Sequence, residues 1–200
     1  MPEVAVGVRM IDRVDEAQLH ELERAIVAGA VAKRRAEFAS GRVLLRSLLA
    51  TNEPVTVLST RAPSLPAGVV ASLAHDAVFV VAAVTTDRWI AALGIDIEPV
   101  DAVTADIVST VLRDDERDID PTLAFVAKEA TYKAWSSLGG RVLDHLEVQL
   151  AFGNEGAFTA TIVDDHRSFG GRSLSVGRRW LALVVDIGND GRHADLADQR

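Results

Sequence analysis

The sequence predicts an α+β protein built from two related halves. Two helical patterns of similar length, at residues 32–49 and 123–138, stand among short segments rich in β-branched residues. The segment 88–97, RWIAALGIDI, also resembles 179–187, RWLALVVDI, and the tryptophans of the two segments lie 91 positions apart. A separation close to half of the 200 residues suggests a repeated unit.

The N-terminal half, residues 1–99, is predicted to alternate strands with two helices. Asp15 is suited to cap the first helix, and apolar side chains follow it at a helical spacing. Two prolines within residues 61–68 predict a turn. The predicted strands are 4–8, 55–58, 69–73, 78–84 and 89–98, and the predicted helices are 16–28 and 32–49.

The C-terminal half, residues 100–200, begins with an acidic connection. Residues 100–120 carry many aspartates, and we expect one short helix among them. The long helix at 123–138 is closed by two glycines, which favour a helix C-terminus. Four antiparallel strands are predicted after it, at 146–150, 156–163, 173–176 and 180–187.

Composition excludes several classes of function. The net charge of −8 argues against nonspecific binding to nucleic acid, and the absence of cysteine excludes disulfides and thiolate metal sites. The longest apolar run, residues 77–84, is too short to span a bilayer, and no basic start precedes an apolar run at the N-terminus. We therefore expect a cytoplasmic protein that binds neither nucleic acid nor membrane.

Two carboxylates on a predicted strand and one on a predicted helix suggest a metal site. Side chains alternate along a strand, so Asp96 and Glu98 share one face. Glu129 and Lys133 are four positions apart and share one face of the second long helix. Mg²⁺ favours oxygen ligands of this kind. Taken separately, the strand pair could be a solvated edge, and the helix pair an exposed contact worth about 0.2–0.5 kcal/mol.

The order of these motifs carries a family resemblance. Residues 94–98, GIDIE, are followed by residues 125–135, FVAKEATYKAW. This combination resembles the 4′-phosphopantetheinyl transferases, in the branch of the enterobactin and surfactin synthetase activators, and it extends over residues 30–136. The resemblance implies a pseudodimer in which each half packs a small antiparallel sheet with a long helix. The active site would lie between the halves.

The resemblance also implies roles for the acidic and basic residues. Asp96, Glu98 and Glu129 would hold Mg²⁺, or Mn²⁺ in its place. Lys133 would face the phosphates and neutralise charge on the leaving group, and Lys128 is a lesser candidate for a phosphate contact. Either Glu129 or a metal-bound water would serve as the base on the incoming serine.

Coenzyme A is the substrate that the resemblance implies, and four further residues would bind its phosphates. The family pattern Arg-x-x-x-Phe-x-x-Gly-Arg is met by residues 34–42, which places Arg34 and Arg42 at the nucleotide. Arg61 fits a basic-x-Pro-x-x-Pro loop that lines the phosphates. His75 would contact the 3′-phosphate.

The sequence departs from the family pattern at several points. Ala74 replaces a serine or threonine, so one hydrogen bond to the ligand is missing. Val126 replaces a small polar residue before the Lys-Glu pair, and Leu65 replaces a tryptophan. Only 33 positions separate Asp96 from Glu129, which shortens the connection that helps to receive the carrier protein.

The predicted function is transfer of the 4′-phosphopantetheine group of coenzyme A to a serine of an acyl or peptidyl carrier protein, with release of adenosine 3′,5′-bisphosphate. The pathways served would be polyketide, nonribosomal peptide or siderophore biosynthesis. One alternative is another Mg²⁺-dependent phosphotransferase. A second is a degenerate relative that binds coenzyme A or a synthase without turnover. A pseudodimer in one chain predicts a monomer.

Overall fold

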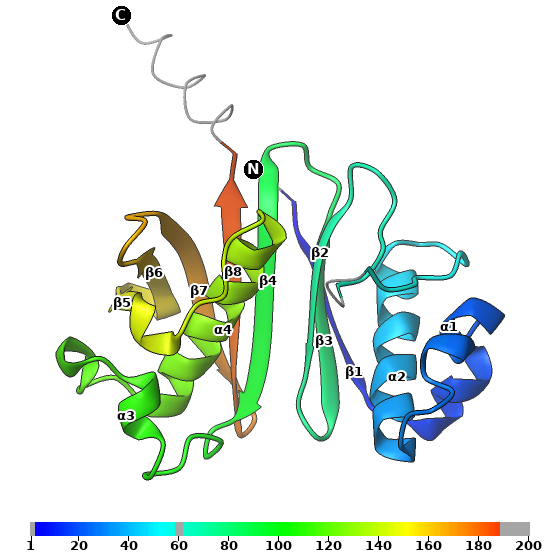
Figure 1. The fold of residues 1–200 in the computed structure, drawn as a ribbon, viewed down its shortest axis with the longest axis horizontal. Coiled ribbons are helices and arrows are strands. Elements are labelled where there is room, and N and C mark those ends of the chain that lie inside the picture. Colours follow the sequence, from blue (N-terminus) through cyan, green and yellow to red (C-terminus); the bar gives the residue numbers. More distant parts are fainter. Residues whose placement is uncertain (1–2, 59–61, 189–200) are drawn as a thin grey trace, which may run out of the picture.

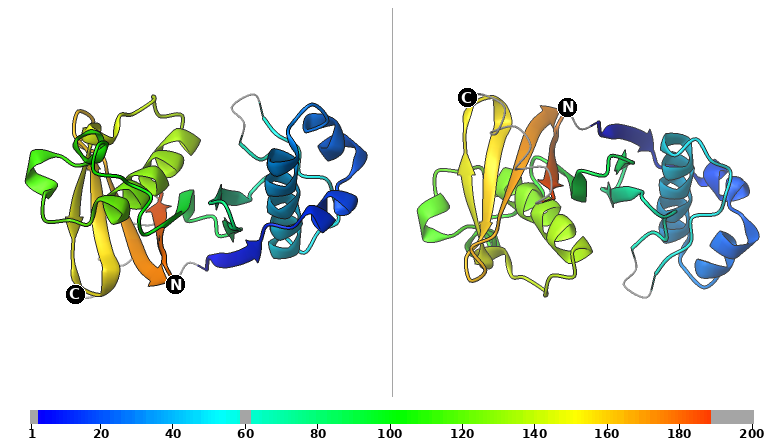
Figure 2. Two further views of the ribbon diagram at one scale, coloured as in Figure 1. Left: turned by 90° about the horizontal axis from the view of Figure 1, so that it is seen from below. Right: turned by 90° about the horizontal axis from the view of Figure 1, so that it is seen from above.

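Two antiparallel sheets stand side by side, and one long helix packs against each (Figure 1 and Figure 2). The structure is a computed structural model and describes residues 3–58 and 62–188. This architecture confirms the predicted α+β fold of two halves. Among the described residues, no helix is both long and apolar enough to cross a membrane.

The N-terminal half holds a three-stranded sheet in the order β1-β3-β2. Its elements are β1 (Ala5–Met10), α1 (Glu21–Ile26), α2 (Ala32–Leu48), β2 (Val70–His75) and β3 (Phe79–Thr85). The helix predicted at 16–28 is wrong. The chain forms a 3₁₀ helix, Arg13–Gln18, and then starts α1 anew, because the backbone N–H of His20 donates to Glu23 at 2.9 Å. The strand predicted at 55–58 is reduced to a single bridge between Val57 and Pro63.

The C-terminal half holds a five-stranded sheet in the order β4-β8-β7-β6-β5. Its elements are β4 (Ile90–Pro99), α3 (Val108–Val111), α4 (Pro121–Ser137), β5 (Val148–Phe152), β6 (Ala157–Ile162), β7 (Ser168–Val176) and β8 (Arg179–Ile187). Helix α4 begins slightly before the predicted start, because Asp120 accepts a hydrogen bond from the backbone N–H of Leu123 at 2.9 Å. Pro121 then occupies the first helical position, where its missing N–H costs nothing.

Strand β4 belongs to the second sheet. The sequence assigned it to the N-terminal half, with a boundary at residue 99, but β4 pairs antiparallel with β8 from Ile90 to Pro99. The chain therefore passes from one sheet to the other at residues 86–89, between β3 and β4.

The two halves repeat one connectivity. In each half, the first strand (β1 or β4) precedes the long helix. The last strand (β3 or β8) lies between this first strand and the strand that comes just before the last one in the chain (β2 or β7), which gives the orders β1-β3-β2 and β4-β8-β7. The sequence echo between residues 88–97 and 179–187 has a different origin, because these segments include β4 and β8, which are neighbours in one sheet. The echo therefore does not mark equivalent strands of the two halves.

An apolar cluster joins the two sheets, and its buried members are Ala74, Val81, Ala83, Ile90, Leu93, Ile95 and Ile97. Two polar contacts reinforce it. The backbone N–H of Ile95 on β4 donates to the hydroxyl of Ser72 on β2 at 3.0 Å, and Arg179 at the start of β8 forms an ion pair with Asp76 after β2. These contacts hold β2 beside β4, and the ends of both strands lie at the same edge as the start of α2 (Figure 1).

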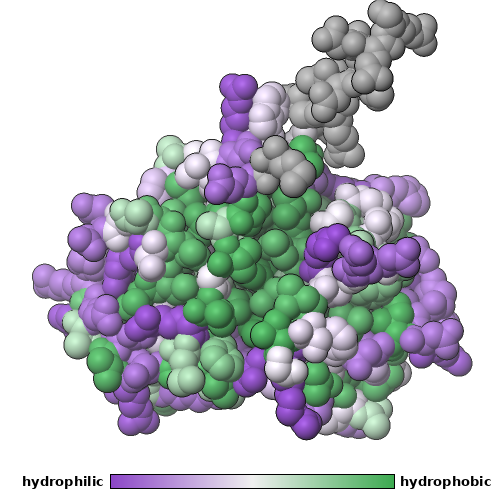
Figure 3. All heavy atoms as spheres, turned by 180° about the vertical axis from the view of Figure 1, so that it is seen from behind, coloured by the Kyte–Doolittle hydropathy of each residue, from purple (hydrophilic) through white to green (hydrophobic). Residues whose placement is uncertain are grey.

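One face of the molecule is apolar over much of its area. Seen from behind, apolar side chains gather across the middle of the surface (Figure 3). On β1, Val6, Val8 and Met10 are exposed, while Gly7 between them packs against Leu44 of α2. The long helix therefore covers one side of β1 and leaves the other side at the surface.

Candidate active site

Strand β4 places two acidic side chains on the face that meets α4. Gly94, Asp96 and Glu98 alternate with two isoleucines that are buried between the sheets. A Cβ added to Gly94 would lie 1.8 Å from the carbonyl oxygen of Ala130 on α4, so this face of β4 touches the helix. The predicted sharing of one face is confirmed, but Asp96 is only 6% exposed and does not lie in the open.

Lys133 of α4 reaches back to β4 and contacts Asp96. Its ammonium group lies 2.6 Å from Oδ1 of Asp96 and 3.0 Å from the carbonyl oxygen of Ile95. Burial raises the pKa of Asp96, although the charge of Lys133 and its hydrogen bond act in the opposite direction. The second oxygen, Oδ2, is buried and has no hydrogen-bond partner among the described residues, which is rare for a buried polar atom.

Glu129, one helical turn before Lys133, is held by a histidine that sequence reasoning missed. Nε2 of His145 lies 2.8 Å from Oε1 of Glu129, and this hydrogen bond lowers the pKa of Glu129 against the effect of burial. His145 is in the connection between α4 and β5, 16 positions after Glu129. The only local signal was a capping pattern, Asp144-x-x-Glu147, which indicates a short helical turn but no contact with α4.

Glu98 completes a cluster of like charges. Partial burial and the neighbouring carboxylates of Asp96 and Asp76 raise its pKa to about 7, with a further contribution from Glu129. Within residues 3–58 and 62–188, no group of three or more acidic, histidine or cysteine side chains is already arranged to hold a metal ion. Asp96 and Glu129 instead direct one oxygen each to Lys133 and His145.

The donor set suits a divalent cation in its chemistry. All the candidate ligands are carboxylate oxygens, which hard cations such as Mg²⁺ prefer. The partnerless Oδ2 of Asp96 leaves one buried acceptor available. Carboxylates that raise the pKa of a neighbour also mark a place where added positive charge would be stabilised.

Removing the Glu98 carboxylate is expected to stabilise the protein at alkaline pH and not at acidic pH. Its folded-state pKa of about 7 exceeds the ordinary 4.5, so the free energy of unfolding falls as pH rises through this interval. The Glu98→Gln variant has no ionisable group at this position, so its free energy of unfolding does not fall in this pH interval for that reason. In urea denaturation without divalent cations, the variant should exceed the wild type in stability at about pH 8 and match it at about pH 4, below the ordinary pKa of the carboxyl group. An equal difference at both values would contradict this account.

Two of the four residues assigned to the nucleotide phosphates lie together. Nη1 of Arg34, near the start of α2, is 3.0 Å from Nε2 of His75, the last residue of β2. Glu37 approaches both, at 3.4 Å from Arg34 and 3.7 Å from His75. A guanidinium and an imidazole at this spacing can share one phosphate group.

Arg42 makes no contact with this pair that the structure shows, although Arg34 lies near enough for its charge to lower the pKa of Arg42, and the assignment of Arg42 to the phosphates stays a prediction. Arg42 is 3% exposed, its Nε donates to the carbonyl oxygen of Val55 at 2.5 Å, and its guanidinium lies over the ring of Phe38. Burial lowers the pKa of Arg42 to about 10. The hydrogen bond to Val55 uses one of the five N–H donors of this side chain. Arg61, the fourth assigned residue, lies outside the described residues.

Lys128 is also buried, and its position corrects the expectation of a phosphate contact. It is 1% exposed, and its ammonium group lies 2.5 Å from Oε2 of Glu116 and 2.8 Å from the carbonyl oxygen of Val111. Burial lowers the pKa of Lys128, against the effect of Glu116. Glu116 in turn accepts from the backbone N–H of Leu150 at 2.7 Å. This ion pair fastens the acidic connection to α4 and β5.

Lys128→Met is expected to destabilise the fold by about 3–5 kcal/mol, because it leaves the buried carboxylate of Glu116 without its cation. Urea denaturation followed by circular dichroism measures this loss. Lys33→Met is the matched control. Its side chain is 71% exposed on α2, and we expect a change within about 0.5 kcal/mol. A Lys128→Met variant as stable as the wild type but inactive would favour the phosphate role.

Comparisons with known proteins cover both halves of the chain. Residues 22–85 match the 4′-phosphopantetheinyl transferase N-terminal domain, and residues 92–184 match the 4′-phosphopantetheinyl transferase superfamily. The chain is 39% identical to the 4′-phosphopantetheinyl transferase Svp of Streptomyces mobaraensis, over 82% of this chain and 75% of that protein. It is 30% identical to the 4′-phosphopantetheinyl transferase Npt of Nocardia iowensis, over 90% and 92% of the two chains. It is 32% identical to the 4′-phosphopantetheinyl transferase PptT of Mycobacterium tuberculosis, over 79% and 78%.

These matches agree with the structure. The interval between the two matched regions, residues 86–91, includes the passage from the first sheet to the second. The relatives align over most of their own length as well as most of this chain. The sequence resemblance is thereby confirmed, and the chain belongs to the 4′-phosphopantetheinyl transferase family.

Proposed function

We propose that this protein transfers the 4′-phosphopantetheine group of coenzyme A to the serine hydroxyl of an acyl or peptidyl carrier protein. The observation that carries the proposal is the convergence of α4 and β4. Lys133 contacts Asp96, and the charge of Glu129 is felt at both Asp96 and Glu98. Membership in the transferase family supports this assignment of the reaction.

The reaction joins the serine oxygen to the β-phosphorus of coenzyme A and breaks the bond from that phosphorus to the bridging oxygen. Adenosine 3′,5′-bisphosphate leaves with that oxygen, and the serine proton passes to a base. Glu129 suits this role, because its lowered pKa keeps the carboxylate ionised near neutral pH. A water molecule beside Glu129 is the alternative base. The ammonium group of Lys133 offsets the charge that develops on the leaving group.

Asp96, Glu98 and Glu129 are the residues that would hold Mg²⁺, or Mn²⁺ in its place. When bound, the cation would neutralise charge on the diphosphate. Asp96 has a free buried oxygen for this purpose, and Glu98 has an elevated pKa that a neighbouring cation would lower. We expect cation binding to strengthen as pH rises through about 7.

Arg34 and His75 are the residues of the described chain that we assign to the 3′-phosphate of coenzyme A, since their nitrogens lie 3.0 Å apart at one edge of the first sheet. Arg42 and Arg61 remain proposed contacts of the phosphates. The carrier would belong to a polyketide, nonribosomal peptide or siderophore pathway. Because one chain supplies both halves, we propose that a monomer is sufficient, acting in the cytoplasm without nucleic acid or membrane.

Mass spectrometry of apo carrier proteins tests the proposal. Each carrier is incubated with the protein and coenzyme A, in Mg²⁺ or in EDTA, and a carrier whose serine is replaced by alanine is the control. We expect one phosphopantetheine per carrier in Mg²⁺, and none in EDTA or on the control. Coenzyme A binding without transfer to any of several carriers would favour a degenerate relative instead.

A further inference from the structure

His145 is a polar residue outside the family motifs that touches the proposed base. A carboxylate can only accept hydrogen bonds, so the 2.8 Å contact requires that Nε2 of His145 carries the hydrogen and donates it to Oε1 of Glu129. The imidazole ring also packs at a tilt against Phe125, one helical turn before Glu129, with ring centroids 5.1 Å apart. The ring is thus fixed by a hydrogen bond on one side and by an aromatic contact on the other.

The segment that carries His145 is itself braced. The carboxylate of Asp144 accepts from the backbone N–H of Leu146 at 3.0 Å, and that of Glu147 accepts from the backbone N–H of Asp144 at 2.7 Å. Arg141 lies 2.6 Å from Glu147, so the segment has a charged contact before His145 and a helical turn around it. These contacts fix the position of the backbone that carries the imidazole ring of His145.

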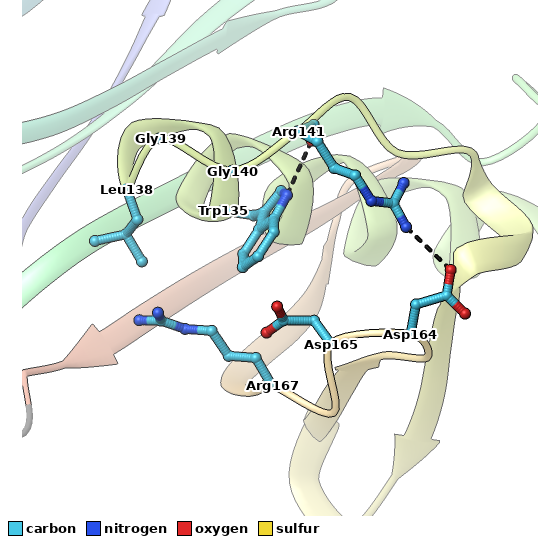
Figure 4. Close-up of a pocket in the computed structure, with 8 residues that line it drawn as sticks. All are labelled: Trp135, Leu138, Gly139, Gly140, Arg141, Asp164, Asp165 and Arg167. Carbon is cyan, nitrogen blue, oxygen red and sulfur yellow. Dashed lines mark hydrogen bonds and ion pairs between the residues drawn. The ribbon is translucent and has the colours of Figure 1, made fainter.

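The cavity at the end of α4 shows how the other end of this segment is attached. It measures about 490 Å³, and its lining includes Trp135, Arg141 and Asp164 (Figure 4). The indole N–H of Trp135 donates to the carbonyl oxygen of Arg141 at 2.9 Å, and the guanidinium of Arg141 lies 3.2 Å from Asp164. Trp135 belongs to α4 and Asp164 follows β6, so the segment is tied to both elements.

The buried carboxylate of Asp96 and the half-buried carboxylate of Glu129, both next to the proposed reaction centre, share one pattern. Oδ1 of Asp96 accepts a hydrogen bond from Lys133, and Oε1 of Glu129 accepts one from His145. Within the described residues, neither Oδ2 of Asp96 nor Oε2 of Glu129 takes part in a hydrogen bond that the structure shows. Each acid is therefore anchored through one oxygen and keeps the other for a ligand.

We propose that His145 is a positioning residue, which holds Glu129 by Oε1 so that Oε2 is presented to the divalent cation. The inference rests on the proposed function, because it assigns Glu129 to that cation. Partners that orient a metal-binding side chain contribute about 10–100-fold to metal affinity. His145 acts through Glu129 and does not touch the substrate.

Binding of Mn²⁺ alone, followed by electron paramagnetic resonance, tests the role without turnover. His145→Phe keeps a ring against Phe125 but removes the donor, and His145→Gln restores an N–H donor at similar reach. We expect His145→Phe to weaken Mn²⁺ binding about 10–100-fold and His145→Gln to recover most of the loss. In a Glu129→Gln background, His145→Phe should change Mn²⁺ binding less than about twofold, because the two residues act as one unit.

Unchanged Mn²⁺ binding in His145→Phe would overturn the proposal. So would a loss of Mn²⁺ affinity on His145→Phe that is as large in the Glu129→Gln background as in the wild type, because such a loss would act through the fold and not through Glu129. Absence of Mn²⁺ binding by the wild type would overturn it too. The transfer assay on carrier proteins keeps the two proposals apart. If the wild type modifies the carrier and His145→Phe binds Mn²⁺ normally, the role proposed for His145 is refuted while the proposed function stands.

Discussion

A Glu129→Gln variant is expected to lose carrier modification by about 10²–10⁴-fold while it still binds coenzyme A. Glutamine has the shape of glutamate and can still accept the hydrogen bond from His145, so the connection after α4 stays in place. It lacks the negative charge that a proton acceptor and a cation ligand both need. Mass spectrometry of the carrier gives the transfer rate, and calorimetry gives the affinity for coenzyme A.

Asp118→Asn is the matched control for this loss of one negative charge. Asp118 is exposed in the connection between α3 and α4, and its replacement should leave transfer within about twofold of the wild type. Near-normal transfer by Glu129→Gln would exclude Glu129 as base and as an essential ligand. Loss of both transfer and coenzyme A binding would place its role in substrate binding.

Gly94→Ala is expected to be among the most destabilising single changes in the protein. The added Cβ would lie 1.8 Å from the carbonyl oxygen of Ala130 and 3.0 Å from the backbone nitrogen of Ala134. Both atoms belong to the backbone of α4, so no side chain can turn aside and the helix must move away from β4. We expect a loss of about 3 kcal/mol or more in the free energy of unfolding. Urea denaturation measures it.

Two other glycines make this prediction specific. Gly170 lies within β7 and has no atom within 4 Å of an added Cβ, so Gly170→Ala should change stability by no more than about 0.5 kcal/mol. Gly7 on β1 faces the other long helix, α2, where the nearest atom to an added Cβ is the flexible Cδ1 of Leu44 at 2.9 Å. Gly7→Ala should therefore cost less than Gly94→Ala. Equal stability of the Gly94 and Gly170 variants would contradict the close approach of α4 to β4.

Much of the fold could be predicted because its signals are local. Asp120 and Pro121 mark the start of α4, and the alternation of Asp96 and Glu98 with isoleucines indicates that the carboxylates share one face of β4 and the isoleucines the other. The two long helices were located to within a few residues. The break before α1 was missed, because it depends on a capping contact between the backbone of His20 and Glu23.

The distribution of basic residues between site and core could not be predicted. Lys128 and Lys133 lie on the same helix, yet one is fully buried against Glu116 and the other reaches Asp96. Arg34 and Arg42 differ in the same way on α2. Such outcomes depend on which helix face meets the sheet and on carboxylates far away in the chain. The contact of His145 with Glu129 depends likewise on the path of a connecting segment.

The central claim is that β4 and α4 together form one cation site, and anomalous scattering from crystals grown with Mn²⁺ and coenzyme A tests it most directly. We predict a single Mn²⁺ peak within coordination distance of the carboxylates of Asp96, Glu98 and Glu129. Lys133 would then have left Oδ1 of Asp96 or turned toward the diphosphate. A peak bound at another place, or one that Glu129 does not reach in the presence of coenzyme A, would contradict the account.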